Sequence, residues 1–310
     1  MFSVVFPGQG SQKIGMAKDL FENYSLVRNL FQEADEVLNM PLSKIIFEGP
    51  QELLNSTENT QPAIFLTSYA IFQVAQKEFG VDLNRAKFIA GHSLGEYSAL
   101  TCFNAINFQD CLKILKQRGK SMQEAIPSEK GSMLVVLGSS LNTIEEILYS
   151  KKENYKCYIA NDNSPQQVVI SGLKTDILKF IEDLNNLGIK NVLLNVSGPF
   201  HCKLMKQATQ IMKTILEEIP MKKLNNKLIS NVTATPVSSL DEIKKLLLLQ
   251  IEAKVRWFES VNYMINHGTN NFIEIGPGKV LSGLIKRINK QVKIQNLNNT
   301  EDIKNINLNV

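Results

Sequence analysis

The pentapeptide Gly91-His92-Ser93-Leu94-Gly95 follows directly on the apolar run Phe88–Ala90 and constrains the fold more than any other segment. Its two glycines lack a Cβ atom, so the chain can turn sharply and hold Ser93 with its hydroxyl exposed. Residues 96–101 are compatible with a helix whose N-terminal amides point back toward the serine. A glycine-bounded loop with an incidental serine has the same letters, but the flanking strand and helix favour a nucleophile elbow.

Length and composition suit one large domain or two unequal ones. The chain has 310 residues, of which 44% are hydrophobic and 21% charged, which is ordinary for a soluble globular protein. No stretch approaches the roughly 18 uninterrupted apolar residues of a membrane span, and Met1 leads into a strand-like segment without the basic start of a secretory signal. We therefore expect a cytoplasmic protein that does not associate with membranes.

Cysteine, histidine and charge argue against several classes of function. The four cysteines form no C-x-x-C pair, which is typical of a reducing compartment. Three histidines without clustered partners show no recognisable metal-ligand spacing, so we expect no metal and no cofactor. A net charge of +4 permits an anionic ligand or an acidic protein partner and does not require a nucleic acid.

Strand-like and helical segments alternate along the chain in a way that predicts two structural units. Before the serine, short apolar strands alternate with helical patterns at 16–38 and 61–78, which favours a parallel sheet covered on both faces. Between residues 131 and 195 the order is β-α-β-β-α-β, the ferredoxin-like arrangement. The predicted fold is α/β: a large α/β-hydrolase-like domain with a parallel sheet (1–128 and 198–310) and an inserted small ferredoxin-like (βαββαβ) domain (129–197). We expect the Lys- and Asn-rich tail after Lys290 to be a solvated end.

A serine hydroxyl is a weak nucleophile and needs a base, for which the sequence offers three histidines. His92 is the neighbour of Ser93 at a sharp turn, where adjacent side chains point apart, and we interpret it as structural. His267 stands at a predicted helix C-terminus, where histidine commonly caps. His201 lies in a loop where the small unit returns to the large one, so it is the favoured base. No Asp or Glu between Ser93 and His201 stands in an obvious strand-end loop, which supports a Ser-His dyad, oriented by a backbone carbonyl, over a triad.

The loop Phe6–Gln12 follows the first predicted strand and contains two glycines that leave backbone amides exposed. Beside the elbow, such a loop can supply an oxyanion-hole donor, with the Leu94 N–H as the second. It could equally be an ordinary strand-to-helix connection. A phosphate-binding loop is less favoured, because the Lys-Ser/Thr ending is missing.

Taken together in order, the motifs closely resemble those of the malonyl-CoA:acyl carrier protein transacylases, over essentially the full length. The matching segments are Phe6–Gln12, Gly91–Glu96, Gln117–Gly119, Asn163–Gly172, Pro199–His201, Gln250 ahead of Val255–Trp257, and Glu274–Lys279. Departures are modest: Lys254 stands where proline is common, Gly131–Met133 varies the usual lead into the small domain, and the tail after Lys290 matches poorly.

The resemblance implies a role for each matching residue. It implies that Ser93 is the nucleophile, that His201 is the base and that the main-chain carbonyl of Gln250 orients His201. The amides of Gln9 and Leu94 would form the oxyanion hole. The Arg118 guanidinium would bind the malonyl carboxylate, and Asn163 and Phe200 would line the pocket. Without the resemblance, Arg118 would be a solvated charge on a basic helix and Asn163 a plain turn former. A phenylalanine directly before the histidine, as Phe200 is before His201, resembles the family members that use malonyl rather than branched extender units.

The function expected from this resemblance is a ping-pong transfer of malonyl from malonyl-CoA to the phosphopantetheine thiol of an acyl carrier protein in fatty acid synthesis. We expect a monomer. A serine esterase or thioesterase of the α/β-hydrolase kind is the alternative, and it predicts a buried Asp/Glu partner for His201 and release of the acyl group to water. A non-catalytic module that binds the carrier protein and a polyketide-type loading domain are further alternatives.

Overall fold

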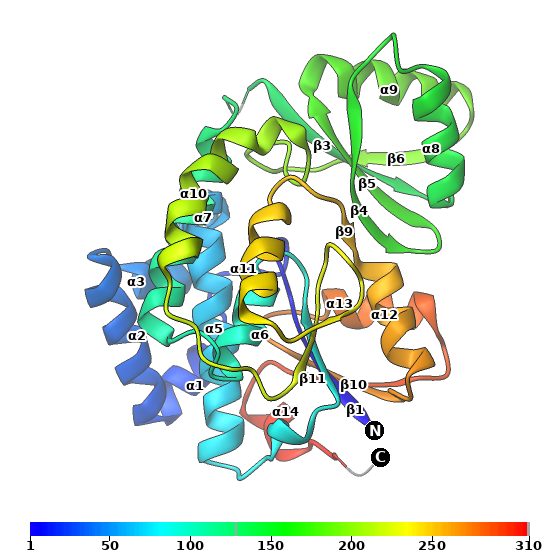
Figure 1. The fold of residues 1–310 in the computed structure, drawn as a ribbon. Coiled ribbons are helices and arrows are strands. Elements are labelled where there is room, and N and C mark those ends of the chain that lie inside the picture. Colours follow the sequence, from blue (N-terminus) through cyan, green and yellow to red (C-terminus); the bar gives the residue numbers. More distant parts are fainter. Residues whose placement is uncertain (128, 309–310) are drawn as a thin grey trace.

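Two β-sheets organise residues 1–127 and 129–308, which are the residues that the computed structural model describes (Figure 1). The expected domain boundary at residue 128 and the end of the chain at residue 310 lie outside the described residues. One sheet is large and mostly parallel, and the other is mostly antiparallel. The fold is therefore mixed α/β.

The large sheet has its strands in the order β11 (Lys293–Leu297), β10 (Asn271–Ile275), β1 (Phe2–Phe6), β2 (Phe88–Gly91), β7 (Lys227–Ile229), β8 (Pro236–Val237). Pairing is parallel from β11 to β7, as the alternation of strands and helices predicts, and antiparallel between β7 and β8. In register, Val4 of β1 lies opposite Ile273 of β10 and Ile89 of β2. The carboxyl ends of β1 and β2 thus meet at one edge, where the loop of Gln9 and the loop of Ser93 begin.

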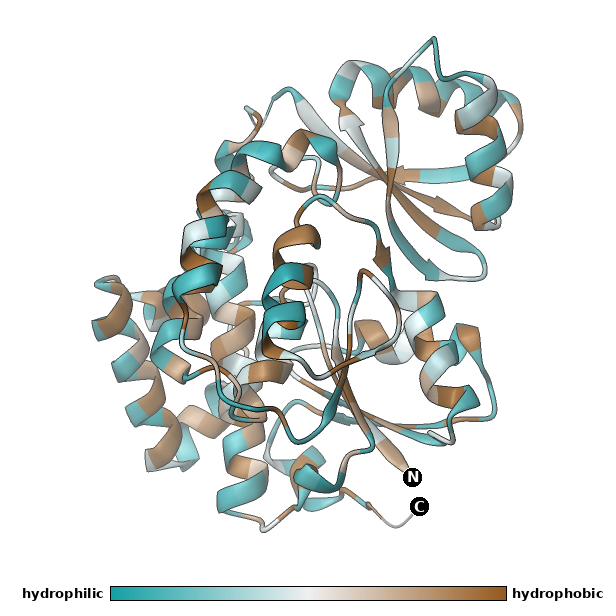
Figure 2. Ribbon diagram, in the orientation of Figure 1, coloured by the Kyte–Doolittle hydropathy of each residue, from teal (hydrophilic) through white to brown (hydrophobic). Residues whose placement is uncertain are grey.

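Helices cover both faces of this sheet, because successive side chains of a strand point to opposite sides. Val4 belongs to the core that includes residues of α5 (Thr57–Lys77), α6 (Gly95–Cys102) and α7 (Phe108–Glu124). Val5 belongs to the core on the other face, with residues of α12 (Trp257–Asn266) and α13 (Val280–Ile288). Figure 2 shows the central strands as predominantly apolar between these helices.

The other helices lie around this framework. They are α1 (Lys18–Asn23), α2 (Ser25–Leu38), α3 (Leu42–Glu48), α4 (Gln51–Asn55), α10 (Lys206–Glu218), α11 (Leu240–Leu249), α14 (Thr300–Lys304), and the 3₁₀ turns η1 (Leu83–Arg85) and η2 (Lys203–Met205). The single helix expected over 16–38 is two helices, because Tyr24 between them is extended, with φ −122° and ψ 122°. Within the described residues, none of the helices combines the length and the apolar character needed to cross a membrane.

The second sheet has the order β6 (Lys190–Leu193), β3 (Gly131–Leu137), β5 (Gln167–Leu173), β4 (Cys157–Ser164), β9 (Val255–Arg256). With α8 (Leu141–Ser150) after β3 and α9 (Lys174–Asn186) after β5, the element order β-α-β-β-α-β is the predicted one. Both helices pack on one core with the strands, in which Phe180 and Leu184 of α9 are buried. The strand β9 comes from outside residues 129–197 and pairs in parallel with β4, so it joins the second sheet to the rest of the chain.

The segment after Lys290 contradicts the expectation of a solvated end. Residues Lys293–Leu297 form β11, which pairs with β10, and the short helix α14 follows. Leu297 and Ile303 are buried. An edge strand needs apolar side chains only where it faces a core, so a few apolar residues among lysines and asparagines suffice here.

Candidate active site

Ser93 lies in a tight turn between β2 and α6, and the two glycines on either side of it permit the close packing of that turn. A Cβ atom on Gly91 would lie 1.9 Å from the Gly95 carbonyl carbon, and one on Gly95 would lie 2.3 Å from the carbonyl oxygen of Phe6 in β1. The left-handed backbone is on the serine itself, with φ 54°. Such a backbone is uncommon for a residue with a side chain and marks a constrained position. The two glycines therefore allow the backbones of β1, β2 and α6 to pack closely, and the strained backbone conformation is that of Ser93.

Ser93 and His201 form a hydrogen-bonded pair. The Ser93 Oγ lies 2.9 Å from His201 Nε2, and His201 Nδ1 lies 2.8 Å from the main-chain oxygen of Gln250. Since a carbonyl oxygen only accepts, Nδ1 carries the hydrogen and Nε2 is the acceptor that faces the serine. In residues 1–127 and 129–308, no Asp or Glu side chain hydrogen-bonds to His201.

Burial keeps the imidazole neutral. His201 is buried, and desolvation, assisted by the nearby positive charge of Arg118, lowers its pKa to about 3. A neutral ring with an unprotonated Nε2 is the form that can accept the proton of a serine hydroxyl. At neutral pH the pair therefore has the geometry and the protonation state that a serine nucleophile and its general base require.

The Arg118 guanidinium reaches the same hydroxyl from α7. Its Nη2 donates to Ser93 Oγ at 3.2 Å and to the side-chain oxygen of Gln250 at 2.9 Å, and its Nη1 donates to the side-chain oxygen of Gln61 at 2.7 Å. The side chain is only 1% exposed, its Nε has no hydrogen-bond partner, and burial lowers its pKa. Among the described residues, Arg118 makes no ion pair. A buried cation without a carboxylate partner is costly, so the site suits an anionic group of a ligand.

A buried polar network supports the elbow from behind. Asn231 Oδ1 accepts from the Ser93 N–H at 2.7 Å, and Asn231 Nδ2 donates to the carbonyl oxygen of Gly91 at 2.7 Å. The Glu96 carboxylate accepts from the Asn231 N–H and, at 2.5 Å, from Gln250 Nε2. Desolvation raises the pKa of Glu96, whereas the hydrogen bonds from Asn231 and Gln250 and the positive charge of Arg118 lower it and favour the carboxylate, which accepts at both oxygens. The network connects Ser93, Gln250 and Arg118 through groups that solvent does not reach.

The loop after β1 lies against the loop after β2. A Cβ atom on Gly8 would be 2.5 Å from the carbonyl oxygen of His92, so the two loops touch there. In the described part of the chain, neither the Gln9 N–H nor the Leu94 N–H donates a hydrogen bond to another group of the protein. The Gln9 side chain donates instead to Thr57 Oγ1 at 3.1 Å. Both amides are thus available to an oxygen bound beside Ser93.

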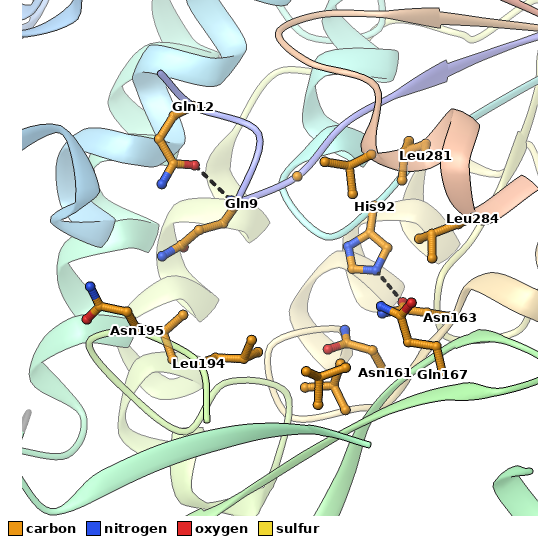
Figure 3. Close-up of a pocket in the computed structure, with 16 residues that line it drawn as sticks. Gln9, Gln12, His92, Asn161, Asn163, Gln167, Leu194, Asn195, Leu281 and Leu284 are labelled. Atoms are coloured by element: carbon orange, nitrogen blue, oxygen red, sulfur yellow. Dashed lines mark hydrogen bonds between the residues drawn. The ribbon is translucent and has the colours of Figure 1, made fainter. Parts of the chain in front are cut away.

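Two adjoining cavities open around these groups. One, of about 100 Å³, is lined by Ser93, His201 and Arg118, together with Phe200 and Met133. The other, of about 340 Å³, shares His92, Gln9 and Asn161 with it and continues between the second sheet and α13 (Figure 3).

The other residues predicted for the site lie along these cavities. Asn163 points to His92, whose Nε2 hydrogen-bonds to Asn163 Oδ1 at 3.0 Å (Figure 3). Phe200 is buried, and its carbonyl oxygen accepts from Ser171 Oγ of β5 at 2.5 Å. His92 lines both cavities, which the sequence interpretation of a purely structural residue did not anticipate. His267 caps α12, with Nδ1 2.7 Å from the Tyr263 carbonyl oxygen, as its predicted helix C-terminal position requires.

Three residues of the network carried no predicted role: Gln61, Glu96 and Asn231. All three are buried, and Glu96 is a charged residue in the otherwise uncharged helix α6, which is the one signal that the sequence contained. Among the described residues, no group of three or more His, Cys, Asp or Glu side chains is placed to hold a metal ion. The four cysteines are free.

Comparison with known proteins assigns this constellation to a family. The family described as "Acyl transferase domain" matches residues 3–306. A malonyl CoA-acyl carrier protein transacylase of Bacillus subtilis (strain 168) is 42% identical over 301 residues, which cover 96% of this chain and 94% of the relative. An acyl-carrier-protein-S-malonyltransferase structure from Bartonella henselae superposes with a TM-score of 0.94 at 40% identity, covering 98% of this chain and 97% of the other.

A third similar protein was solved with its partner. It is a malonyl-transacylase in complex with a type II PKS acyl-carrier protein, with a TM-score of 0.93, 38% identity, and coverage of 98% of this chain and 97% of the other. The matches extend over nearly the whole chain in sequence and in structure. The chain belongs to the acyl transferase domain family, among its malonyl-CoA:acyl carrier protein transacylases.

Proposed function

We propose that the protein transfers the malonyl group of malonyl-CoA to the phosphopantetheine thiol of an acyl carrier protein, through a malonyl ester of Ser93, and so supplies fatty acid synthesis. The names of its relatives support the reaction. The observation that carries the assignment to this site is the buried Arg118 guanidinium, which has no carboxylate partner in the described residues and hydrogen-bonds to the Ser93 hydroxyl. Malonyl is an acyl group with the free carboxylate that such a cation needs.

The first half-reaction forms the ester. Ser93 Oγ attacks the thioester carbonyl carbon while His201 Nε2 takes the hydroxyl proton. The Gln9 and Leu94 N–H groups stabilise the oxyanion that develops on the carbonyl oxygen. The C–S bond then breaks, the proton passes from His201 to the sulfur, and free coenzyme A leaves. The Gln250 carbonyl holds the imidazole in the required tautomer throughout, by its 2.8 Å contact to Nδ1.

The second half-reaction reverses these roles with another thiol. The phosphopantetheine thiol gives its proton to His201 and attacks the ester carbonyl, and the proton returns to Ser93 Oγ as the C–O bond breaks. Asn163 and Phe200 line the path that the pantetheine arm and the acyl group occupy. The larger cavity, of about 340 Å³, accommodates the arm, and the smaller one accommodates the acyl group. No metal or cofactor takes part in the steps proposed.

Arg118 selects the acyl group. A guanidinium meets a carboxylate through two parallel hydrogen bonds, and Arg118 lines the smaller cavity together with Ser93. A neutral acyl group such as acetyl would leave the buried cation unpaired. The site therefore favours malonyl over acetyl.

The division of the chain follows the two sheets. We assign residues 1–128 and 198–310 to an α/β-hydrolase-like domain and 129–197 to an inserted ferredoxin-like domain. The strand order β6-β3-β5-β4 supports the second assignment, since it places the first and third strands of the unit at the centre of its sheet. The site lies between the two units. We further propose a monomeric cytoplasmic enzyme with acyl carrier protein as its partner, a pairing supported by the complex of a structural relative.

The alternative, a serine esterase or thioesterase, predicts an acidic partner for His201, and among the described residues the imidazole is bonded to a main-chain carbonyl instead. Mass spectrometry of the intact protein after brief mixing with malonyl-CoA distinguishes the two. We expect one malonyl adduct that is absent from Ser93→Ala and is discharged by phosphopantetheinylated acyl carrier protein. An adduct lost to water without the carrier would show a thioesterase, and no adduct at all would contradict the transacylase.

A further inference from the structure

The buried carboxylate of Glu96 has no part in the chemistry above, although it lies in the hydrogen-bond network behind Ser93. It is on the first turn of α6, three residues after Ser93, and is 1% exposed. One oxygen accepts from the Asn231 N–H and the other from Gln250 Nε2 at 2.5 Å. A carboxylate in such a place is costly to desolvate, so its retention points to a specific task.

Gln250 connects this carboxylate to the Arg118 guanidinium. Its side-chain oxygen accepts from Arg118 Nη2 at 2.9 Å, while its Nε2 faces Glu96 and also lies 3.2 Å from the Ser93 carbonyl oxygen. The two ends of a glutamine amide have nearly the same shape, so its neighbours decide which end points where. A flipped amide would place its NH2 against the guanidinium and its oxygen against the carboxylate, and both contacts would be repulsive.

We propose that Glu96 is a positioning residue that fixes the Gln250 amide with its oxygen toward Arg118 and thereby holds the guanidinium in place for the malonyl carboxylate. The proposal rests on the proposed function and adds a determinant of acyl-group specificity outside the pocket lining. Glu96 acts through Gln250 and touches neither substrate nor the reacting atoms.

Gln250 takes part both in the orientation of His201 and in the positioning of Arg118, but through different groups. Its main-chain oxygen orients His201, whereas its side-chain oxygen holds Arg118. Disturbing the side chain while the main chain stays in place should harm the recognition of a carboxylate more than the serine chemistry. The second Glu96 contact, to Asn231, bears on the elbow and would affect all acyl groups alike.

The test is Glu96→Gln, which replaces one acceptor oxygen by a donor in the same volume. The Asn231 N–H is a fixed backbone donor, whereas the Gln250 amide can rotate, so we expect the new side chain to keep its oxygen toward Asn231 and to turn its NH2 toward Gln250, whose amide then flips. We expect kcat/KM for loading from malonyl-CoA to fall on the order of tenfold to a hundredfold, with a smaller fall for acetyl-CoA, so that the malonyl-to-acetyl ratio drops. An unchanged ratio, or equal losses for both donors, would overturn the proposal.

Two further proteins make the result specific. Glu274→Gln is the matched control: Glu274 is also buried, on β10, but accepts from Leu281 N at 3.0 Å and Ser282 N at 2.8 Å at the start of α13. We expect it to keep the wild-type ratio. In an Arg118→Ala background, Glu96→Gln should have no further effect on the ratio, because its effect passes through the guanidinium. A further drop there would overturn the proposal.

Should Glu96→Gln not fold, Glu96→Asp gives the same information, because it keeps acceptor oxygens but withdraws them by one methylene. We expect a ratio below that of the wild type, and a wild-type ratio would overturn the proposal. The wild-type protein itself tests the proposed function in the same assay. A wild type that loads no malonyl refutes that function, whereas a wild type that loads malonyl and variants that keep its ratio refute only the role of Glu96.

Discussion

Arg118 is the residue on which the proposed acyl-group specificity depends, and its burial lowers the stability of the free protein. Its guanidinium is buried against Gln61, Gln250 and Ser93, all of which are neutral, and an aromatic ring, that of Tyr97, lies 5.5 Å from it. Neutral partners satisfy hydrogen bonds but do not balance the charge, and the Glu96 carboxylate interacts with it only from beyond Gln250, so the free protein holds a buried cation with no carboxylate in direct contact. In the proposed function, the malonyl carboxylate removes this deficit when it binds.

We therefore expect Arg118→Ala to lower kcat/KM for loading from malonyl-CoA by about a hundredfold or more, while loading from acetyl-CoA is kept or improved. Pre-steady-state loading of each donor onto Ser93 measures both values. Lys116→Ala is the matched control on the same helix, since Lys116 lies in a partly exposed ion pair with Glu58. We expect the control to keep both rates. Equal losses for malonyl and acetyl in Arg118→Ala would refute the role of the guanidinium as carboxylate anchor.

The sequence predicted residues whose chemistry is unusual for their position, and it missed those that act through others. Ser93 between two glycines and His201 in a loop at a change of pattern could be singled out, and the resemblance to a family supplied Arg118 and Gln250. Glu96 and Asn231 could not be assigned, because a hydrogen bond between residues 135 positions apart has no local pattern. A lone polar residue beside a buried strand shows that a partner is needed but does not identify it.

At the level of elements, the strand–turn–helix unit around Ser93 depends on backbone contact. The helix α6 lies so close to β1 that Gly95 leaves no room for a Cβ atom beside the Phe6 carbonyl oxygen, 2.3 Å away. The two glycines stand out in the sequence, and from the sequence alone we explained them by the sharp turn that they permit. Their φ values are outside the left-handed region, and close approach explains them instead.

Accordingly, Gly95→Ala should be strongly destabilising, by several kcal/mol, because backbone atoms on both sides must move to admit the methyl group. Gly283→Ala on α13 provides the contrast: its Cβ would have nothing within 4 Å, and we expect a gain of about 0.5–1 kcal/mol from the higher helix propensity of alanine. Urea unfolding of the two variants measures both changes. Similar stabilities for the two variants would show that α6 can shift without cost.

Element boundaries were predicted well where the hydrophobic period is strong and poorly where a single backbone conformation decides. The strands and helices of the second unit follow the predicted order, whereas the break at Tyr24 comes from one extended residue in an otherwise helical pattern. The strand β11 was missed because an edge strand with lysine and asparagine on its open side resembles a tail.

Over the whole molecule, the site depends on the meeting of the two sheets. The strand β9 pairs with β4, and Ser171 of β5 donates to the Phe200 carbonyl oxygen next to His201. The imidazole is buried in the folded protein between Ser93 and the Gln250 carbonyl, which come from distant parts of the chain, so its pKa depends on the folding of those parts together. An unfolded chain exposes the same ring to water, where its pKa is ordinary.

This difference in pKa predicts how stability changes with pH. The folded-state pKa of His201, about 3, is below its ordinary value of 6.5, so below pH 6.5 the unfolded chain binds a proton that the folded chain excludes. The contribution of His201 to the free energy of unfolding is present in full above pH 6.5 and falls by about 1.4 kcal/mol per pH unit as the pH drops toward the folded-state value. The loss is therefore on the acid side only.

Comparison with His201→Asn isolates this contribution, because every other titrating group is common to both proteins. Asparagine is chosen because the backbone at this position has φ 58°, a conformation that asparagine adopts more readily than most residues. We expect the difference in free energy of unfolding, wild type minus variant, to be constant above pH 7 and to fall by about 2 kcal/mol between pH 6.5 and pH 5 in urea titrations. A difference that stays constant over this interval would mean that His201 takes up a proton in the folded protein as readily as in the unfolded chain, so that burial between the two sheets does not keep the base neutral.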